Sequence, residues 1–321
     1  MDKSAKVFVA GHRGLVGSAL VRELEHRGYD KIVTRTRSEV DLRDQRAVQS
    51  FFAEENPDVV LLAAAKVGGI HANNVSRWEF LHENLQIQNN VLGASLDNRA
   101  EKVVFFGSSC IYPKLSDQPI KEDYLLTGAL EPTNEPYAIA KIAGLKLVES
   151  ANIQYGQSWL SLMPTNLYGP GDNFDLVTSH VLPAMIRKFH EAKLRRESGD
   201  NAPVVLWGSG KALREFLHVD DLARAALHLM ETGATGLYNV GYGSDLPIRQ
   251  LAATIAAIVD YDGPIEWDTT RTDGTPRKFL DSSKIRATGW APAITLDDGI
   301  RSTYDWYLKH SAIESLIAAR H

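Results

Sequence analysis

The feature that most constrains the fold is a glycine-rich turn between a short apolar stretch and an amphipathic one. Residues 6–10 (KVFVA) are apolar and rich in β-formers, and Gly11, Gly14 and Gly17 follow them. Residues 15–26 then place their apolar side chains on one helical face. Glycines in this context permit a tight turn, a close approach of pyrophosphate and close packing of helix on strand. The pattern therefore predicts the first strand–turn–helix unit of a dinucleotide-binding domain.

The same alternation continues through the first half of the chain. Helix-like stretches at 46–55, 78–98 and 137–155 separate strand-like stretches at 31–34, 58–64, 102–106 and 158–163. Strands that alternate with helices are typical of a parallel sheet covered on both faces. We therefore predict an α/β fold in which residues 1–169 form a Rossmann-type, doubly wound parallel sheet.

The rhythm changes after residue 169. Short strand-like stretches now separate helix-like ones at 181–193, 220–231, 248–259 and 296–308. We predict that residues 170–321 form mainly a smaller α/β substrate-binding cap domain, with residues 212–240 returning to the Rossmann sheet. The charged residues 194–201 are expected to form a surface loop, and the residues after His310 a helical tail.

Composition excludes several classes of protein. The 321 residues carry a net charge of −5, and 44% of them are hydrophobic, so the balance does not suggest a nucleic-acid partner. Apolar runs are too short for a membrane span, and the first residues lead into a strand without a signal-peptide core. The single cysteine, Cys110, cannot form an intrachain disulfide. These features favour a cytoplasmic location, and they leave Cys110 available as a thiol.

The glycine turn and the segment after the second strand indicate which dinucleotide binds. NAD enzymes usually carry an acidic residue there for the ribose 2′-hydroxyl. This chain has Arg37 instead, and with Arg13 it suits the 2′-phosphate of NADP(H), although two solvated surface arginines are the alternative. The expected contacts with the cofactor in this region are Gly11, His12, Arg13, Gly14, Leu15, Val16, Gly17, Arg37, Asp41, Leu42 and Ala64.

A second group of residues is suited to proton transfer. Tyr137 and Lys141 have the i,i+4 spacing that places a lysine beside a tyrosine on one helix face. Ser108, at the end of the preceding strand, could hydrogen-bond a substrate oxygen while Tyr137 donates a proton to it. Cys110 adds a further acid or base, although taken alone it is more often a small buried core residue.

Five stretches together resemble the extended short-chain dehydrogenase/reductase family. They are residues 107–113 (GSSCIYP), 131–143 (EPTNEPYAIAKIA), 163–171 (MPTNLYGPG), 207–221 (WGSGKALREFLHVDD) and 273–278 (DGTPRK). The resemblance extends from Val7 to about Leu308. Within the family it is similar to the epimerase-reductases of GDP-4-keto-6-deoxy-D-mannose. It implies NADPH-dependent inversion at C3 and C5 and reduction at C4, which yields GDP-L-fucose.

The resemblance also implies roles for single residues. Ser108, Tyr137 and Lys141 correspond to the reductase triad, and Cys110 and His180 to the base and acid of epimerisation, in an order that stays open. His180 also follows Thr178-Ser179 in a segment that resembles a helix N-cap. Further cofactor contacts are implied for Lys141, Pro164, Thr165, Asn166, Leu167 and His180.

For the GDP-sugar, the resemblance implies a separate set of contacts. Arg214 and Lys278 would bind the diphosphate, while Trp207 would stack on the base or close the pocket. The full set is Lys188, Trp207, Arg214, Asp273 and Lys278. Relatives often have an arginine pair where this chain has Arg187-Lys188, and a lysine lacks the forked donor geometry. We expect no metal, and we expect a homodimer through the helices near 78–98 and 137–155.

Two other functions fit the same motifs. One is a nucleotide-sugar epimerase or dehydratase of this fold that keeps its cofactor and returns the hydride. Such enzymes commonly favour NAD and would not need Arg37 together with Cys110. The other is a non-catalytic NADP-binding scaffold, which should have lost catalytic positions, yet Ser108, Tyr137 and Lys141 are all present.

Overall fold

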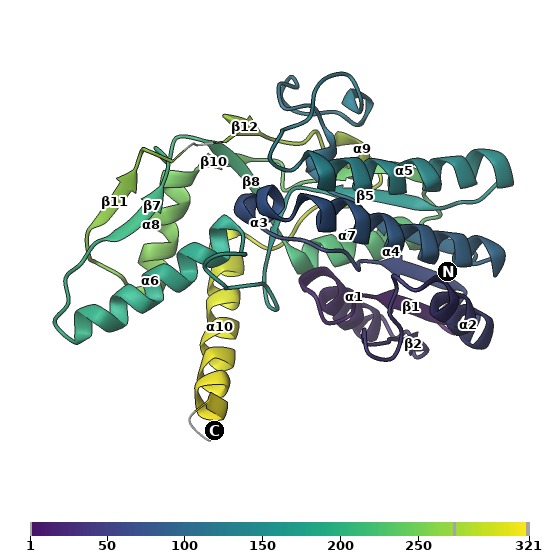
Figure 1. Ribbon diagram of the computed structural model, residues 1–321, viewed down its shortest axis with the longest axis horizontal. Helices are drawn as coiled ribbons and strands as arrows, with labels where there is room; N and C mark the ends of the chain where they lie inside the picture. The colour runs from purple at the N-terminus through teal and green to yellow at the C-terminus, as the bar shows by residue number, and fades with distance from the viewer. Residues whose placement is uncertain (1, 272–273, 319–321) are drawn as a thin grey trace.

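The computed structural model describes residues 2–271 and 274–318 of the chain. Within them, six parallel strands form the central sheet in the order β2-β1-β3-β4-β5-β9 (Figure 1). The strands are β1 (Val7–Ala10), β2 (Ile32–Val33), β3 (Val59–Leu62), β4 (Lys102–Phe106), β5 (Leu160–Pro164) and β9 (Gly236–Val240). The chain reverses its direction of winding between β1 and β3, and ligands of such sheets bind at the carboxyl ends of the strands there.

Helices cover both faces of this sheet. On one face lie α1 (Leu15–His26) and α7 (Val219–Glu231), and on the other α2 (Gln45–Glu55), α4 (Arg77–Asp97) and α5 (Glu135–Tyr155). The long helices α4 and α5 run side by side (Figure 1). The buried Gln88 on α4 donates a 2.6 Å hydrogen bond to the Ala140 carbonyl on α5. These contacts hold the start of α5 in a fixed position over the end of β4.

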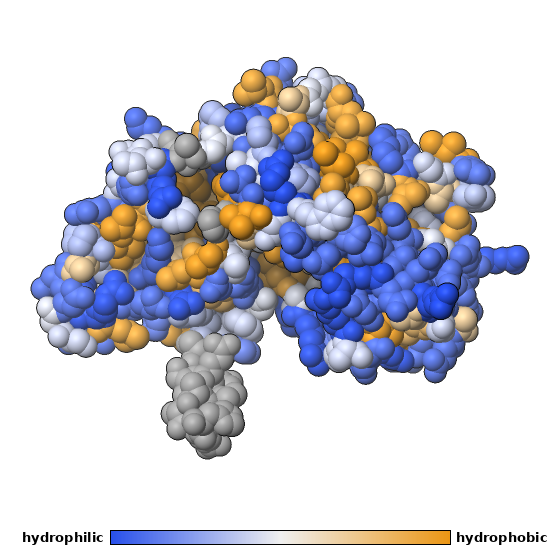
Figure 2. All heavy atoms as spheres, in the orientation of Figure 1, coloured by the Kyte–Doolittle hydropathy of each residue, from blue (hydrophilic) through white to orange (hydrophobic). Residues whose placement is uncertain are grey.

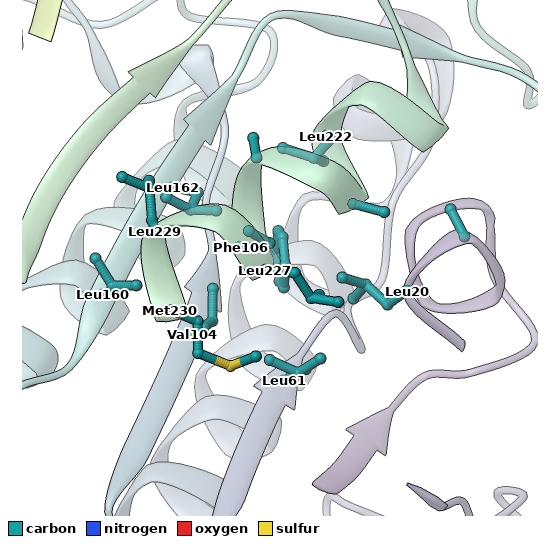
Figure 3. Packing of buried hydrophobic residues seen from close by; sticks show 14 of the residues in the cluster. Leu20, Leu61, Val104, Phe106, Leu160, Leu162, Leu222, Leu227, Leu229 and Met230 are labelled. Carbon is teal, nitrogen blue, oxygen red and sulfur yellow. The ribbon is translucent and has the colours of Figure 1, made fainter. Parts of the chain in front are cut away.

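Alternation along the strands builds the two cores of the sheet. On β4, Val104 and Phe106 face the α1–α7 side, while Val103 and Phe105 face the α4–α5 side. Figure 3 shows the first of these cores, where side chains from α1, the strands and α7 meet: Leu20, Leu61, Val104, Phe106, Leu160, Leu162, Leu222, Leu227, Leu229 and Met230. Each large apolar side chain buried here stabilises the fold by roughly 1.5–3 kcal/mol.

The remaining elements form a second lobe with its own core. Its helices are α6 (Val181–Glu197), α8 (Ile248–Val259) and α10 (Leu296–Ala318), packed with the parallel pair β7 (Val204–Trp207) and β11 (Ile265–Asp268). Between the lobes lies a small sheet of β10 (Asp245–Pro247), β8 (Leu213–His218) and β12 (Arg277–Lys278), with β6 (Asn166–Tyr168) also paired to β8. The end of α10 projects away from the rest of the molecule (Figure 1).

Short elements complete the chain. They are the helices α3 (Ile70–Val75) and α9 (Ser283–Arg286) and the 3₁₀ turns η1 (Ser109–Ile111) and η2 (Glu122–Tyr124). In the described part of the chain, every helix is too short or too polar to span a lipid bilayer.

The predicted fold class is confirmed, with differences at the ends of several elements. Helix α6 continues to Glu197, so the expected loop at 194–201 is wrong for its first four residues. Arg195 and Arg196 occupy the last turn of α6, where cations interact favourably with the helix dipole. Helix α5 begins at Glu135, because Pro136 is well suited to the first turn. Residues 212–240 were expected to return to the Rossmann sheet. Of their two strands, β9 joins this central sheet, whereas β8 belongs to the small sheet.

Candidate active site

The glycine turn forms a cradle at the end of β1. Gly11 has φ of +87°, and a Cβ there would lie 2.8 Å from the Ala64 backbone. A Cβ at Gly17 would overlap the Gly11 carbonyl. Helix α1 begins directly after Gly14, so the unpaired N–H groups of its first turn face the cradle. The buried Nδ1 of His12 has no hydrogen-bond partner in the protein. An anionic ligand such as a pyrophosphate fits this set of donors.

The arginines after β2 differ in their surroundings. Arg35 forms an ion pair within the protein, with its Nη2 2.5 Å from the Glu55 carboxylate. Arg37 remains largely exposed, with its Nε 3.6 Å from the carboxylate of Asp41. Hydrogen bonds from Arg43 lower the pKa of Asp41 to about 2. Arg37 is thus held in the segment after β2 by the ionised carboxylate of Asp41, and its remaining donors face solvent.

The strand order brings the other predicted cofactor contacts to the same edge of the sheet. Ala64 follows β3, which lies next to β1 in the sheet. Ser108 follows β4, the next strand along. Pro164 ends β5, and the hydroxyl of Thr165 and the amide of Asn166 both donate to the Glu215 carbonyl, at 3.1 and 2.7 Å. These two side chains tie the end of β5 to the small sheet that carries the predicted substrate contacts.

Tyr137 and Lys141 lie one turn apart near the start of α5. Lys141 is 4% exposed, and its Nζ donates a 2.8 Å hydrogen bond to the Phe106 carbonyl at the end of β4. Burial lowers the pKa of Lys141 to about 8. Burial, and secondarily the nearby Cys110, raise the pKa of Tyr137. At neutral pH the pair is therefore a phenol beside an ammonium, which is the form needed to donate a proton.

Cys110 lies in the η1 turn, directly after Ser108. The Ser108 hydroxyl oxygen accepts a 3.2 Å hydrogen bond from the Cys110 backbone N–H, so it fixes the position of the turn. The Cys110 sulfur accepts from Asn134 Nδ2 at 3.3 Å and from Lys278 Nζ at 3.8 Å. Asn134 was not among the predicted site residues. The sequence feature that could have identified Asn134 is its position directly before the Glu-Pro-Tyr segment of α5, which carries Tyr137.

His180 occupies the N-cap position of α6, but its side chain makes no capping hydrogen bond. The segment before it is held to the loop after β3, where the Gly69 N–H donates to the Thr178 carbonyl at 2.9 Å. Desolvation, and then the charge of Lys278, lower the pKa of His180. The imidazole is therefore neutral at pH 7 and, because capping does not engage it, is available for proton exchange.

Lys278 connects these groups to the predicted diphosphate site. It stands opposite Arg214 in the register between β12 and β8, and Arg214 Nη2 would lie 3.6 Å from a Cβ on Gly274. The structure therefore brings together Cys110, Tyr137, His180, Arg214 and Lys278.

Two other predicted substrate contacts, Trp207 and Lys188, form a second group on β7 and α6. Trp207 is 58% exposed, with Lys188 Nζ 5.7 Å from its ring centre and Arg271 Cζ 4.9 Å from it. Lys188 also donates to the Val205 carbonyl at 3.0 Å. Arg271 was missed in the sequence, although it lies two residues before Asp273. Asp273 itself lies outside the described residues.

One hollow adjoins Cys110, and a second lies beside the first. The smaller is lined by Ser109, Cys110, Tyr112, Pro113, Lys114, Gln118, Ile120, Glu131, Thr275, Arg277 and Lys278. A larger hollow of about 670 Å³ lies beside it, between residues 113–117 and 124–132. Across residues 2–271 and 274–318, histidine, cysteine and carboxylate side chains do not gather into a group able to hold a metal ion.

Comparisons with known proteins agree with this architecture. Residues 7–241 match the model of the NAD dependent epimerase/dehydratase family. GDP-L-fucose synthase 1 of Arabidopsis thaliana is 54% identical, over 96% of this chain and 95% of its own. GDP-L-fucose synthase of Escherichia coli K12 is 53% identical, over 95% and 97%. The structure of MlghC, a GDP-mannoheptose C4 reductase from Campylobacter jejuni with NADP bound, has a TM-score of 0.89 at 40% identity and covers 96% of this chain and 99% of its own. The chain belongs to the NAD dependent epimerase/dehydratase family.

Proposed function

We propose that this enzyme uses NADPH to convert GDP-4-keto-6-deoxy-D-mannose to GDP-L-fucose, by inverting C3 and C5 and reducing C4. The names of relatives more than 50% identical over nearly the whole chain support this substrate. The observation that carries the chemistry is that the half-buried Tyr137 phenol neighbours the Cys110 thiol, while Lys278 acts on both that thiol and the His180 imidazole.

Epimerisation uses the acidity of the carbons on either side of the C4 ketone. One group of the Cys110 and His180 pair takes the proton from C3 or C5, and the C–H electron pair moves into an enolate whose charge rests on the C4 oxygen. A proton is then returned to the opposite face of that carbon, and the ketone reforms. Tyr137 stabilises the enolate by hydrogen-bonding its oxygen.

Reduction follows at the same carbonyl. Bound NADPH supplies a hydride to C4. Tyr137 gives its phenolic proton to the C4 oxygen, so the ketone becomes an alcohol. The ammonium of Lys141 stabilises the phenolate that remains, and Ser108 orients the oxygen. Both reactions use Tyr137 against one oxygen, so the sugar can stay bound between them.

The residues present fit NADPH. The glycine cradle and the first turn of α1 would hold the pyrophosphate, and Arg37 with Arg13 would bind the 2′-phosphate. A relative of this fold has been solved with NADP bound. Asp41, Leu42, Ala64, Pro164, Thr165, Asn166 and Leu167 would complete the site.

The nucleotide of the substrate would lie along the second lobe. Arg214 and Lys278 would bind its diphosphate, and Trp207 with Lys188 would take the base. Asp273 stays a predicted contact. In this proposal residues 1–169 bind mainly the cofactor and residues 170–321 mainly the substrate.

The protein is proposed to act as a cytoplasmic homodimer through α4 and α5. Figure 2 shows hydrophobic surface over α5, and exposed apolar side chains on these helices include Trp78, Ile139, Leu147 and Ile153. Apolar patches of this kind commonly mark a protein interface. A chain with one cysteine and an NADPH-dependent reaction suits a reducing compartment.

The test is to mix the purified protein with NADPH and GDP-4-keto-6-deoxy-D-mannose and to follow NADPH absorbance. Loss of NADPH with formation of GDP-L-fucose supports the proposal. Conversion without net NADPH loss would favour an epimerase or dehydratase that returns its hydride. Cofactor binding without any conversion would favour a scaffold.

A further inference from the structure

We propose that Lys278 is a positioning residue for the carbon–hydrogen step, because its ammonium holds Cys110 as a thiolate beside the sugar. This inference rests on the proposed function and deepens it, since it assigns Lys278 a role beyond that of a diphosphate ligand. It depends on the approach of Lys278 Nζ to within 3.8 Å of the Cys110 sulfur.

Two donors from different elements converge on that sulfur. Lys278 reaches it from β12, and Asn134 Nδ2 reaches it at 3.3 Å from the residue before α5. A thiolate accepts such hydrogen bonds more strongly than a neutral thiol does, particularly when one donor is charged. Both donors therefore point at the sulfur that the proposal makes the base.

The other charged side chains near Cys110 have carboxylate or cation partners of their own. Lys114 Nζ lies 3.8 Å from Glu131, and Arg277 makes hydrogen bonds of 2.5 and 3.0 Å with Asp245. These ion pairs neutralise much of their field at the sulfur. On the α5 side the facing titratable group is the Tyr137 phenol, and its raised pKa keeps it uncharged at neutral pH.

The same ammonium acts on His180. After desolvation, the charge of Lys278 is the second cause that lowers the pKa of this histidine. One cation therefore disfavours the imidazolium at His180 and also contacts the Cys110 sulfur at 3.8 Å. Lys278 is thus near both of the groups proposed to exchange protons with the sugar.

Ionisation matters because a free thiol, with a pKa of about 8.5, is only a few per cent thiolate at pH 7. In the proposed step the thiolate takes the proton, the S–H bond forms, and the C–H pair becomes the enolate. An opposite charge within about 4–6 Å typically lowers the pKa of an acidic group by 1–3 units. Lys278 would raise the fraction of active base accordingly.

Cys110 is the only cysteine of the chain, so its ionisation can be read directly on the intact protein. The probe is iodoacetamide, which alkylates the thiolate, applied across pH 5 to 10 without substrate or NADPH. For Lys278→Met we expect the pH midpoint of alkylation to rise by about one unit and the rate at pH 7 to fall about tenfold. Lys278→Arg, which keeps the charge, should recover most of the rate.

Lys114→Met is the matched control, because Lys114 lines the same hollow but pairs with Glu131. Its midpoint should match that of the unaltered protein. Identical midpoints for Lys278→Met and the unaltered protein would overturn the inference. Lys278→Gln provides a second neutral variant if the methionine variant does not fold, as judged by circular dichroism.

Alkylation requires no turnover, so it is independent of whether the proposed reaction occurs. With the GDP-sugar, the two roles of Lys278 also separate. If Lys278 served only the diphosphate, Lys278→Met would raise KM and leave the alkylation midpoint unchanged. If it also holds the thiolate, the pH profile of solvent-deuterium uptake into the sugar should move upward together with the midpoint.

Discussion

The Nζ of Lys141 lies 5.8 Å from the centre of the Tyr137 ring, and it is fixed there by a 2.8 Å hydrogen bond to the carbonyl of Phe106. The ammonium is thus anchored to the end of β4 rather than bonded to the phenol. Burial makes both groups harder to ionise, since it raises the pKa of Tyr137 and lowers that of Lys141. The arrangement suits a phenol that is protonated before reduction and stabilised by a nearby cation once its proton has left.

Replacing Tyr137 by phenylalanine removes the proton donor but keeps the aromatic ring. This ring packs edge-on against Phe80, with the two ring centres 6.2 Å apart. We expect Tyr137→Phe to slow the reduction of the C4 ketone by about 100- to 10,000-fold, the range for loss of a general acid. NADPH affinity, measured by fluorescence titration, should change little. A turnover rate equal to that of the unaltered enzyme would rule out the donor role.

Lys141 gives the reduction a defined pH dependence. Its pKa is lowered to about 8, so the ammonium loses its proton as pH rises through this value. The single-turnover rate of reduction should therefore be steady near pH 7 and should fall above about pH 8. In Lys141→Arg the guanidinium stays charged, so the falling limb should move to higher pH even if the absolute rate is lower. If the rate fell at the same pH in both proteins, the titrating group would be a residue other than Lys141.

Local spacing explains why part of the site could be predicted from the sequence. The glycine turn and the Tyr137–Lys141 pair each depend on residues within one turn or one helix, where spacing fixes geometry. The contact of Lys278 with Cys110 joins residues 168 positions apart. It depends on how β12 aligns with β8 and on how η1 leaves β4, and these tertiary features have no local pattern. Arg271 escaped prediction for the same reason, because its approach to Trp207 depends on the pairing of β11 with β7.

Arg37 should decide the preference for NADPH over NADH. Its guanidinium is largely exposed and would form charged hydrogen bonds with the 2′-phosphate, each worth about 1.5–3 kcal/mol. Arg37→Ala should raise the KM for NADPH by about 10- to 100-fold and leave the KM for NADH nearly constant. Arg22→Ala is the matched control, since Arg22 pairs with Asp220 instead. An equal rise for both cofactors in Arg37→Ala would contradict the role.

The proposed dimer makes a separate prediction about α5. Leu147 is 41% exposed on that helix, and a carboxylate there would have to be desolvated in an α4–α5 interface. Leu147→Glu should shift the protein from dimer to monomer in light scattering coupled to size-exclusion chromatography. Leu194→Glu changes a similarly exposed leucine on α6, at 48%, and should leave the dimer intact. If Leu147→Glu and Leu194→Glu both gave the assembly mass of the unaltered protein, this interface would be excluded.

The most direct test of the central claim is to run the reaction in deuterium oxide and to locate deuterium in the product. If one site both epimerises and reduces, the product should be GDP-L-fucose with deuterium at C3 and C5, and one NADPH should be consumed per sugar. Cys110→Ser should lower this uptake more than Lys114→Met does. A reduced sugar that keeps the original configuration and hydrogens at C3 and C5 would contradict the account, because it would show a reductase without epimerase chemistry.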